Sequence, residues 1–597
     1  MIILGIHDGH DASAALMVDG KIVAANQQER FSKLKGDYGL PVDAIKNCFK
    51  LAKLSFGNVD HVSLASKTLN PVLLRLKRNA NFSVSDWIKE QEDYWKPVKF
   101  QKKKVNYWKL FKNSKNFKQD KIYNYDGVLS SYMNYKIMNT FLKRRVNTIS
   151  KFLKIDKSKI STQLHEDCHK YYSYYFFDNR KDGILLTSEG VGDYSSGSVS
   201  TVKKNNFKLK AHTKENHLAH IYQYITLLLG MKPNQHEYKV MGMAPYAQNY
   251  EIKKCLKTFM EILKIKKLNI VYKKKPKDLF FYFKDKFKDC RFDGIAGALQ
   301  VFLELNLSKW IDSCIKILKN KNIYFSGGVA QNIKAGMYAS QNTKLKNIFI
   351  PPAAGDTSLS IGACYLLAHQ ICDRKKINKN NYIKPINNLY LGFRNDQDPE
   401  KYILKNKLNR KYIFKKDYTN KEVAKMLSQG LAIGRCFGQM EFGLRALGNR
   451  SILCDPRKFE NISIINKKIK KRDFWMPFTP TILFEDRKKF ISNPKNLDGR
   501  FMSMAFETKK FAHKNLQAAI HPYDKTARAQ ILKKNDNKEY FEIIKEFKKI
   551  TGVGALLNTS LNLHGLPIAM DYKDTIHVFK NSDLDVVLLD NCYLKKK

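Results

Sequence analysis

The sequence predicts an α/β protein with two domains, and three observations lead to this fold class. The chain has 597 residues, which is more than one hydrophobic core usually spans. Short apolar segments of strand character end in glycine-rich loops and alternate with helical patterns, as in α/β sheets. A segment at 373–397, rich in Lys and Asn at its start, separates two parts that do not repeat one another. We therefore expect domains at 1–372 and 398–597, joined by this linker.

The first domain opens with a predicted β-meander. Residues 2–6 form a short apolar strand, and the segments 13–18 and 21–26 flank Asp19-Gly20, a strong signal for a two-residue hairpin. A helical spacing of apolar residues follows at 41–53. Further strands are predicted at 184–187, 322–325, 347–350 and 431–436. Further helices are predicted at 292–318 and 420–428, and another follows the loop 351–358 and ends at 371.

Residues 67–160 differ from the rest of the first domain. They are dense in Lys, Asn, Trp, Tyr and Phe and contain few glycines, which predicts a helical insertion. Interleaved basic and aromatic residues could also stack on and neutralise a nucleic acid. Ordinary amphipathic helices have the same composition, and we favour that interpretation.

The net charge and the cysteines limit which partners and which cellular compartment are expected. The formal net charge of +52 suits a polyanionic partner, but the excess is mostly Lys and is spread over the whole chain. Lys, Asn, Ile, Tyr and Phe are the residues of AT-rich codons, so we favour genome bias and do not expect nucleic acid as a partner. None of the ten cysteines forms a C-x-x-C pair, which fits a reducing cytoplasm. We expect neither a signal peptide nor a membrane span.

Four loops that follow predicted strands carry glycine and polar residues: GIHDGHDASAAL at 5–16, SEGVGD at 188–193, SGGVAQN at 326–332 and PPAAGDTS at 351–358. The first has the strand–turn–strand pattern with Asp and Gly that the actin/hexokinase-type ATPase fold uses at phosphates, although ordinary hairpins also carry Asp-Gly. Glycine-rich loops present backbone N–H groups to phosphates. The predicted nucleotide-binding residues are Asp8, Gly192, Asp193, Gly327, Gly328 and Asn332.

His165 and His169 are four residues apart and share one face of a predicted helix, a spacing suited to one metal ion. Such a pair is also common as surface decoration. Acidic residues in the flanking loops, Glu189 or Asp193 together with Asp356, add to the metal interpretation. Two imidazoles with one or two carboxylates suit Fe(II), Mn(II) or Zn(II).

The second domain carries cations in a context that is not simply basic. Arg445 and Arg450 lie among glycines and apolar residues in GQMEFGLRALGNRSILCDPR, and an Arg fork suits phosphate groups. Each could instead be a solvated surface charge. The predicted anion- and nucleotide-binding residues of this domain are Arg445, Arg450, Lys470, Arg472, Arg528, Asn558, Ser560 and Asn562.

The first half resembles the O-carbamoyltransferase family that modifies nodulation factors and antibiotics. The opening segment, the paired histidines, the G-V-G-D loop, SGGVAQN and AAGDTSLSIGA follow in the family order. This half also looks like the tRNA threonylcarbamoyl transferase of the same ATPase superfamily, which implies a duplicated actin/hexokinase-type (ASKHA) α/β domain. The resemblance implies an iron held by His165, His169, Glu189 and Asp356, with Glu189 standing where the family typically has Asp.

The second half resembles the α+β YrdC-like domain of that family through MEFGLRALGNRSI, IKKRDFWMPFTP, HPYDKTARAQ and LLNTSLNLHGLP. The resemblance implies that carbamoyl phosphate and ATP, with or without Mg²⁺, yield carbamoyl-adenylate there with the help of Arg472. The first domain would then transfer the carbamoyl group to a hydroxyl of a sugar or small-molecule acceptor, with His10 or Asp11 taking the proton. A tRNA-modifying enzyme and a basic nucleic-acid-binding protein remain as alternatives.

Overall fold

The computed structural model describes residues 1–129, 134–463, 465–466, 469 and 473–597. The predicted site residues Lys470 and Arg472 lie outside these ranges. The chain forms two compact units, Met1–Ile386 and Asn387–Lys597. The division falls inside the segment 373–397, and the start of that segment packs on the first unit, where Lys384 N donates to Gly20 O and Ile386 N to Phe176 O.

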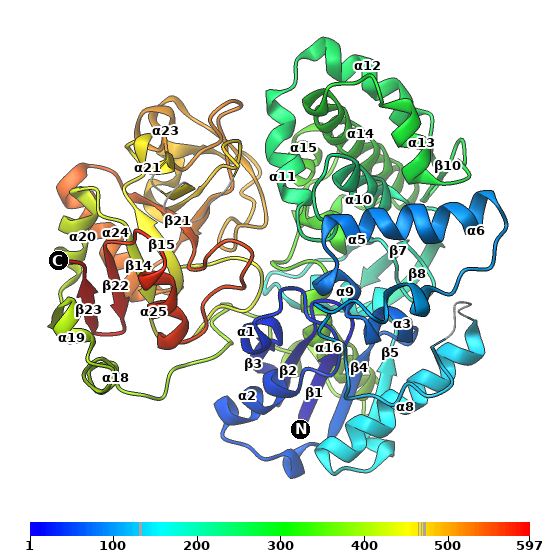
Figure 1. The fold of residues 1–597 in the computed structure, drawn as a ribbon, viewed down its shortest axis with the longest axis horizontal. Helices are drawn as coiled ribbons and strands as arrows, with labels where there is room; N and C mark the ends of the chain where they lie inside the picture. Colours follow the sequence, from blue (N-terminus) through cyan, green and yellow to red (C-terminus); the bar gives the residue numbers. More distant parts are fainter. Residues whose placement is uncertain (130–133, 464, 467–468, 470–472) are drawn as a thin grey trace. The chain divides into compact units, whose positions relative to one another are not determined.

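The first unit contains two five-stranded sheets of the same topology (Figure 1). One has the order β3 (Lys21–Gln27), β2 (Ser13–Val18), β1 (Ile2–His7), β4 (His61–Ala65), β5 (Ile160–Gln163). The other has the order β8 (Asn206–Thr213), β7 (Gly197–Lys203), β6 (Gly183–Ser188), β11 (Asn322–Ser326), β12 (Asn347–Phe349). In each, the central strand pairs antiparallel with the second strand and parallel with the fourth. The mixed α/β architecture is confirmed, and the first unit repeats one sheet topology.

The predicted hairpin and the major helices are present. Asp19 and Gly20 both adopt positive φ between β2 and β3, as a tight hairpin requires. The predictions at 41–53, 292–318 and 420–428 correspond to α2 (Val42–Ala52), α14 (Phe292–Leu318) and α20 (Asn420–Ser428).

Two helices position residues of the site: α9 (His165–Tyr175) carries His165 and His169, and α16 (Leu359–Arg374) follows the short turn that begins at Asp356. Both pack so closely that side chains are excluded at two glycines. A Cβ on Gly5 of β1 would lie 1.9 Å from Ser360 O of α16, and a Cβ on Gly362 would lie 2.1 Å from Cys168 O of α9. Glycine at these positions lets both helices approach their neighbours and fixes where their N-termini lie.

The described parts of the segment 67–160 consist mainly of short helices joined by loops. It comprises α3 (Pro71–Arg75), α4 (Arg78–Asn81), α5 (Val84–Lys89), a π-helical turn η2 (Glu90–Trp95), α6 (Lys96–Phe100), α7 (Tyr107–Phe111) and α8 (Tyr135–Leu153). Many of its aromatic residues turn inward: Phe82, Trp87 and Phe111 are fully buried together with Leu227 and Phe280 from outside the segment. The aromatic residues therefore build a core, as amphipathic helices do.

The remaining elements of the first unit flank these sheets. They are α1 (Glu29–Ser32), α10 (Leu218–Leu228), α11 (Glu237–Met243), α12 (Asn249–Met260), β9 (Leu263–Lys266), β10 (Asn269–Tyr272), α13 (Leu279–Lys286), α15 (Ile333–Asn342) and α17 (Lys379–Tyr382). No helix in the described ranges is both long and apolar enough to cross a membrane.

The second unit is built on an eight-stranded mixed sheet. Its order is β13 (Ile413–Lys416), β23 (Cys592–Lys595), β22 (Val586–Leu589), β14 (Ile433–Cys436), β15 (Arg450–Cys454), β21 (Ala555–Ser560), β16 (Thr479–Leu483), β20 (Gln530–Leu532). A smaller sheet joins β17 (Ile491–Ser492), β18 (Phe506–Thr508) and β19 (Thr526–Ala527). The helices include α18 (Pro399–Lys405), α19 (Leu408–Lys411), α23 (Lys510–Asn515), α24 (Lys538–Thr551) and α25 (Tyr572–Lys580).

Candidate functional site

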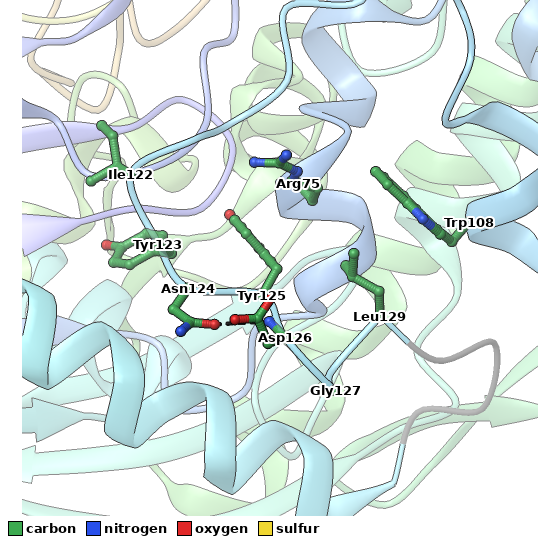
Figure 2. A pocket seen from close by; sticks show the side chains of 9 residues that line it. All are labelled: Arg75, Trp108, Ile122, Tyr123, Asn124, Tyr125, Asp126, Gly127 and Leu129. Carbon is green, nitrogen blue, oxygen red and sulfur yellow. Dashed lines mark hydrogen bonds between the residues drawn. The ribbon is translucent and has the colours of Figure 1, made fainter.

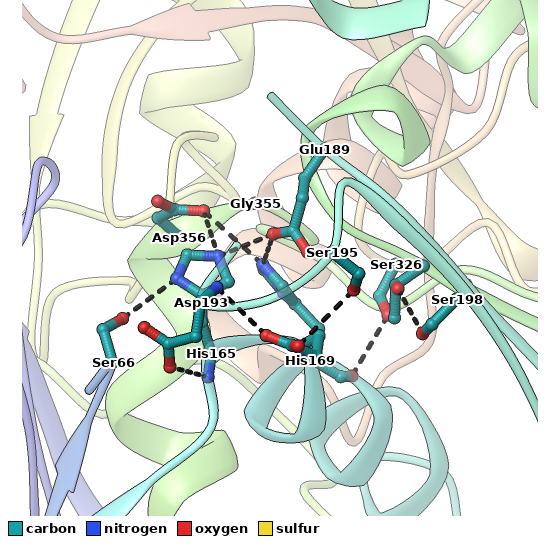
Figure 3. Close-up of polar contacts among 12 residues, drawn as sticks. Ser66, His165, His169, Glu189, Asp193, Ser195, Ser198, Ser326, Gly355 and Asp356 are labelled. Carbon is teal, nitrogen blue, oxygen red and sulfur yellow. Dashed lines mark hydrogen bonds and ion pairs between the residues drawn. The ribbon is translucent and has the colours of Figure 1, made fainter. Parts of the chain in front are cut away.

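Four buried or nearly buried donor side chains meet in the first unit (Figure 3). His165 and His169 come from successive turns of α9, Glu189 follows β6 directly, and Asp356 begins the short turn before α16. One ligand atom from each residue lies within 4.8 Å of the others. The elements brought together here are far apart in sequence, so the fold assembles a compact set of two imidazoles and two carboxylates.

The spacing of these atoms fits a shared metal ion. His165 Nε2 lies 2.6 Å from Glu189 Oε2 and 3.5 Å from Asp356 Oδ1, and His169 Nε2 lies 3.1 and 3.5 Å from the same two oxygens. Neighbouring ligands about 2.1 Å from one ion are themselves roughly 3 Å apart. Within the described residues, the two Nε2 atoms and the Glu189 carboxylate make no hydrogen bond of good geometry although all are buried. Buried polar atoms left in this state call for a further partner.

Hydrogen bonds orient the His165 ring and hold the backbone at both histidines. The Ser66 hydroxyl lies 2.9 Å from His165 Nδ1, and the Asp193 carboxylate accepts from the His165 backbone N–H at 2.8 Å. Ser326 Oγ donates to the His169 carbonyl at 3.1 Å. With Nδ1 of His165 engaged, its Nε2 is the atom left to face the carboxylates, which is the arrangement that metal-ligating histidines show.

The charges of the cluster reinforce one another. Burial opposes ionisation, but the two histidines lower the pKa of Glu189 to about 2. Burial also opposes protonation of His165, yet the Glu189 and Asp356 carboxylates raise the pKa of His165 well above its ordinary value. The site therefore carries stable negative charge that a cation of either kind, a proton or a metal ion, would neutralise.

His10 and Asp11 lie beside this cluster, at its more open side. His10 Nε2 is 3.0 Å from Asp356 Oδ2, and His10 Nδ1 is 3.3 Å from Asp11 Oδ2. The side chains of His10 and Asp11 are 35% and 26% exposed, whereas His169 is fully buried. An imidazole that is partly accessible and one contact away from a metal-type cluster is placed to exchange a proton with a bound hydroxyl.

Asp8 does not face an open ligand site. Its carboxylate is fully buried and accepts two hydrogen bonds from Arg145, at 2.7 and 2.8 Å, and one from the Tyr123 hydroxyl at 2.7 Å. Arg145 and Tyr123 belong to the segment 67–160, so this segment braces the first loop. The burial of Arg145 has a signal in the sequence, because Arg145 is four residues from both Phe141 and Ile149 and shares the buried face of α8 with them.

Other residues of the predicted nucleotide loops have structural partners. Asp193 accepts from the backbone of Lys67, Thr68 and His165. The Asn332 side chain caps α15 at Ala335 N.

The glycines of these loops differ in the space around them. Gly327 has φ of +92° and passes so close to β6 that a Cβ would lie 2.5 Å from Ser188 O. A Cβ on Gly192 would lie 2.4 Å from Ser195 O. Gly328 differs from the other two glycines, because no atom lies within 4 Å of a Cβ built on it. That space leaves the Gly328 backbone accessible to a ligand.

In the second unit, Arg450 is a buried brace. It is fully buried, and its guanidinium donates to the carbonyls of Met570, Phe437, Asn449 and Gly438 at 2.9 to 3.2 Å. All of these acceptors are backbone oxygens, so Arg450 ties the loop 437–449 to the segment before α25.

The remaining predicted residues of the second unit lie on β21 and the loops around it. Asn558 is buried and donates to Ala446 O at 3.1 Å, and Ser560 Oγ donates to Asn562 Oδ1 at 2.7 Å. Arg445 is half-buried, and Arg528 is half-buried with its Nε enclosed. A residue that we did not predict, Arg435, is also fully buried.

The structure is that of an α/β protein of two units, whose first unit contains a buried histidine–carboxylate cluster that could hold a metal ion. The sequence matches the family descriptions "Carbamoyltransferase N-terminus" over residues 2–365 and "Carbamoyltransferase C-terminus" over residues 424–596. The chain therefore belongs to the carbamoyltransferase family and is a transferase enzyme.

The chain is also similar to individual proteins along most of its length. The chain is 30% identical over 618 residues to an uncharacterized protein of Methanocaldococcus jannaschii, with 100% of both chains covered. It is 26% identical over 601 residues to nodulation protein NolNO of Sinorhizobium fredii, covering 98% of this chain and 79% of that protein. Among solved structures, component A of (R)-2-hydroxyglutaryl-CoA dehydratase from Acidaminococcus fermentans matches 62% of this chain and 99% of its own, at 12% identity and a TM-score of 0.33.

Proposed function

We propose that the protein is an O-carbamoyltransferase that works in two steps. In the second unit, which we take to be YrdC-like, hydrolysis of carbamoyl phosphate gives carbamate and phosphate, and the carbamate oxygen attacks the α-phosphorus of ATP to give carbamoyl-adenylate and pyrophosphate. The first unit, which we take to be an actin/hexokinase-type domain because one sheet topology occurs twice in it, transfers the carbamoyl group to a hydroxyl of a sugar or natural-product acceptor and releases AMP. Ten free cysteines fit a reducing compartment, the cytoplasm, for this chemistry.

The observation that carries the proposal is the position of His10 beside the four-residue cluster. His165, His169, Glu189 and Asp356 would hold one transition-metal ion, for which Fe(II) is our first choice and Mn(II) and Zn(II) are the alternatives. When bound, such an ion supplies Lewis-acid polarisation of an oxygen ligand.

The protein's own residues supply the rest of the transfer step. His10 Nε2 is held by Asp356 and Nδ1 by Asp11, so the ring is oriented from both sides. We assign the His10–Asp11 pair as the group that takes the proton of the attacking hydroxyl. Lys470 and Arg472, which lie outside the described residues, are assigned to the anionic intermediate of the first step, with Arg472 as its main ligand.

The experiment that tests the function is product analysis by mass spectrometry. The purified protein is incubated with carbamoyl phosphate, ATP and a fractionated cell extract, and products heavier by one carbamoyl group are sought. The expected result is a new carbamoylated product that requires both co-substrates, accompanied by AMP. If ATP is consumed without AMP, or a product forms without ATP, the two-step scheme is wrong.

A further inference from the structure

Arg435 of β14 carries a buried positive charge that no acid among the described residues neutralises. Its side chain is fully buried, and its Nη1 donates to Gly448 O at 2.7 Å and to Asn449 Oδ1 at 2.8 Å. In the described ranges it makes no ion pair, and its Nε and Nη2 make no hydrogen bond. Burial of an ionised group without a counter-ion is strongly unfavourable, so a partner for this charge is expected.

The unused nitrogens form one edge of the guanidinium, and this edge holds carboxylates elsewhere in the chain. Nε–H and one N–H of Nη2 point the same way and can bind two oxygens of one group. Arg145 uses this edge on Asp8, at 2.8 and 2.7 Å. Four other arginines use it in the same way: Arg78 on Glu90, Arg291 on Asp293, Arg457 on Asp455 and Arg500 on Asp498. In Arg435 the same edge has no partner among the described residues.

Aromatic rings stabilise the face of the Arg435 guanidinium but not this edge. The Arg435 Cζ lies 4.3 Å from the centre of the Phe437 ring and 5.7 Å from that of Tyr540. A ring stacked on a guanidinium interacts with its face, whereas the N–H groups point outward in its plane. A buried water molecule could accept from one of these N–H groups but would supply no charge. The edge therefore fits an anion better than water.

The charges around Arg435 agree with this interpretation. Glu441 acts on it from beyond ion-pair distance, and Glu441 Oε1 already accepts from three backbone N–H groups of the loop 447–450. Three nearby tyrosine hydroxyls are neutral at physiological pH. Burial lowers the pKa of Arg435. Burial also opposes the charge of Arg145, but there the Asp8 carboxylate offsets it and the pKa of Arg145 is raised.

Arg75 shows why burial matters to the argument. It borders a largely open depression of about 750 Å³ in the first unit (Figure 2), and its Nε also makes no hydrogen bond within the described residues. Arg75 is only half-buried, and its Nη1 donates to the Asp120 carbonyl. Water that enters the depression solvates this charge, so nothing there requires an anion. Arg435 has no such access, because it is fully buried.

We propose that Arg435 binds an anion with two oxygens on one atom, a carboxylate or a phosphate group, through Nε and Nη2. Phe437 is itself only half-buried, so displacement of its ring would expose the guanidinium and admit the anion. Under the proposed function this anion is the carbamate or the phosphate formed from carbamoyl phosphate. That identity rests on the proposed reaction, whereas the anion site does not.

Binding to the full chain is measured by isothermal titration calorimetry with sodium phosphate and, separately, with sodium acetate, both without ATP. We expect saturable binding of at least one of them, and the tighter one identifies the group. Arg435→Lys keeps the charge but loses the paired N–H edge, so it should weaken binding about tenfold or more. Arg457→Lys is the matched control without effect, because Asp455 already occupies the same edge of Arg457.

Thermal unfolding gives a second readout that does not depend on the lysine variant. Wild type and Arg435→Met are melted with and without the anion that binds more tightly. The anion should raise the melting temperature of the wild type by a few degrees and leave that of Arg435→Met unchanged, because a ligand stabilises only the protein that binds it. Equal stabilisation of both proteins would overturn the proposal.

Three calorimetric results would also overturn it. They are no saturable binding of phosphate or acetate, equal affinities of wild type and Arg435→Lys, and loss of binding in Arg472→Ala alone, which would place the anion at the predicted nucleotide-binding residues instead. AMP release from carbamoyl phosphate and ATP is recorded in parallel. Anion binding that depends on Arg435 without AMP release would contradict the proposed reaction and leave the anion site intact, and AMP release without such binding would do the reverse.

Discussion

Replacing Arg145 by Met should destabilise the first unit strongly without touching any candidate metal ligand. The Arg145 and Asp8 side chains are both 0% exposed and share two hydrogen bonds of 2.7 and 2.8 Å. Removal of the guanidinium leaves the Asp8 carboxylate buried with the Tyr123 hydroxyl as its remaining side-chain donor. Breaking a buried ion pair from one side costs about 3–5 kcal/mol, because an uncompensated charge remains. We expect a loss of that size in the free energy of unfolding.

The assay is urea unfolding followed by tryptophan fluorescence, since all tryptophans except Trp475 lie in the first unit. Arg144→Met is the matched control, because Arg144 is less buried and donates to Asn124 in an exposed loop. Adding Asp8→Asn to Arg145→Met should recover part of the loss by removing the orphaned charge. If Arg145→Met lowers the free energy of unfolding by less than about 1 kcal/mol, or by the same amount as Arg144→Met, Arg145 does not stabilise the first unit through Asp8. Asp8 would then again be a candidate ligand-binding residue.

The remaining predictions concern the two candidate sites. Metal analysis of purified protein should find about one transition-metal ion per chain, reduced at least tenfold in His169→Ala and unchanged in His217→Ala; equal content in both variants would exclude the cluster as the metal site. His10→Ala should abolish most carbamoyl transfer at normal thermal stability while carbamoyl-adenylate formation continues, and equal loss of both steps would contradict separate sites. Arg450→Met should lower the stability of the second unit by several kcal/mol, whereas Arg472→Ala should lose the first step at normal stability; the reverse pattern would interchange their roles.

The parts of the fold that local sequence determines were predictable. The Asp19-Gly20 turn and the helix 292–318 follow from turn chemistry and from apolar periodicity, and both are confirmed. The histidine pair is local as well, because a spacing of four on a helix places both rings on one face. The carboxylates that join it, Glu189 and Asp356, come from separate loops, so their place in the cluster followed from the resemblance to a known family and not from spacing.

Long-range pairing is what the sequence could not show. Asp8 and Arg145 are separated by 137 positions, and nothing near Asp8 indicates that a partner already occupies its carboxylate. In a chain with a net charge of +52, a single buried arginine also does not stand out from its exposed neighbours. The roles of Asp8 and Arg450 as buried braces therefore appear only when both ends of each contact are known.

Hydrogen-bond satisfaction separates bracing residues from candidate ligand residues more sharply than residue type does. In the first unit, Asp8 is fully paired, whereas Glu189 retains buried oxygens without hydrogen bonds within the described ranges. The second unit divides in the same way. Arg450 is saturated by carbonyls, but Nε and Nη2 of Arg435 and Oε2 of Glu441 lack hydrogen bonds in the described part of the chain.

Both of these open groups are anchored to the loop 446–450. Arg435 Nη1 donates to Gly448 O at 2.7 Å, and Glu441 Oε1 accepts from the backbone N–H of Leu447 and Asn449, also at 2.7 Å. Because unpaired buried donors and acceptors are costly, Arg435 and Glu441 are candidates for contact with a ligand. The ligand-facing part of the motif MEFGLRALGNR would then be Glu441 and the backbone that it contacts at 447–449, with the guanidinium of Arg450 holding that backbone in shape.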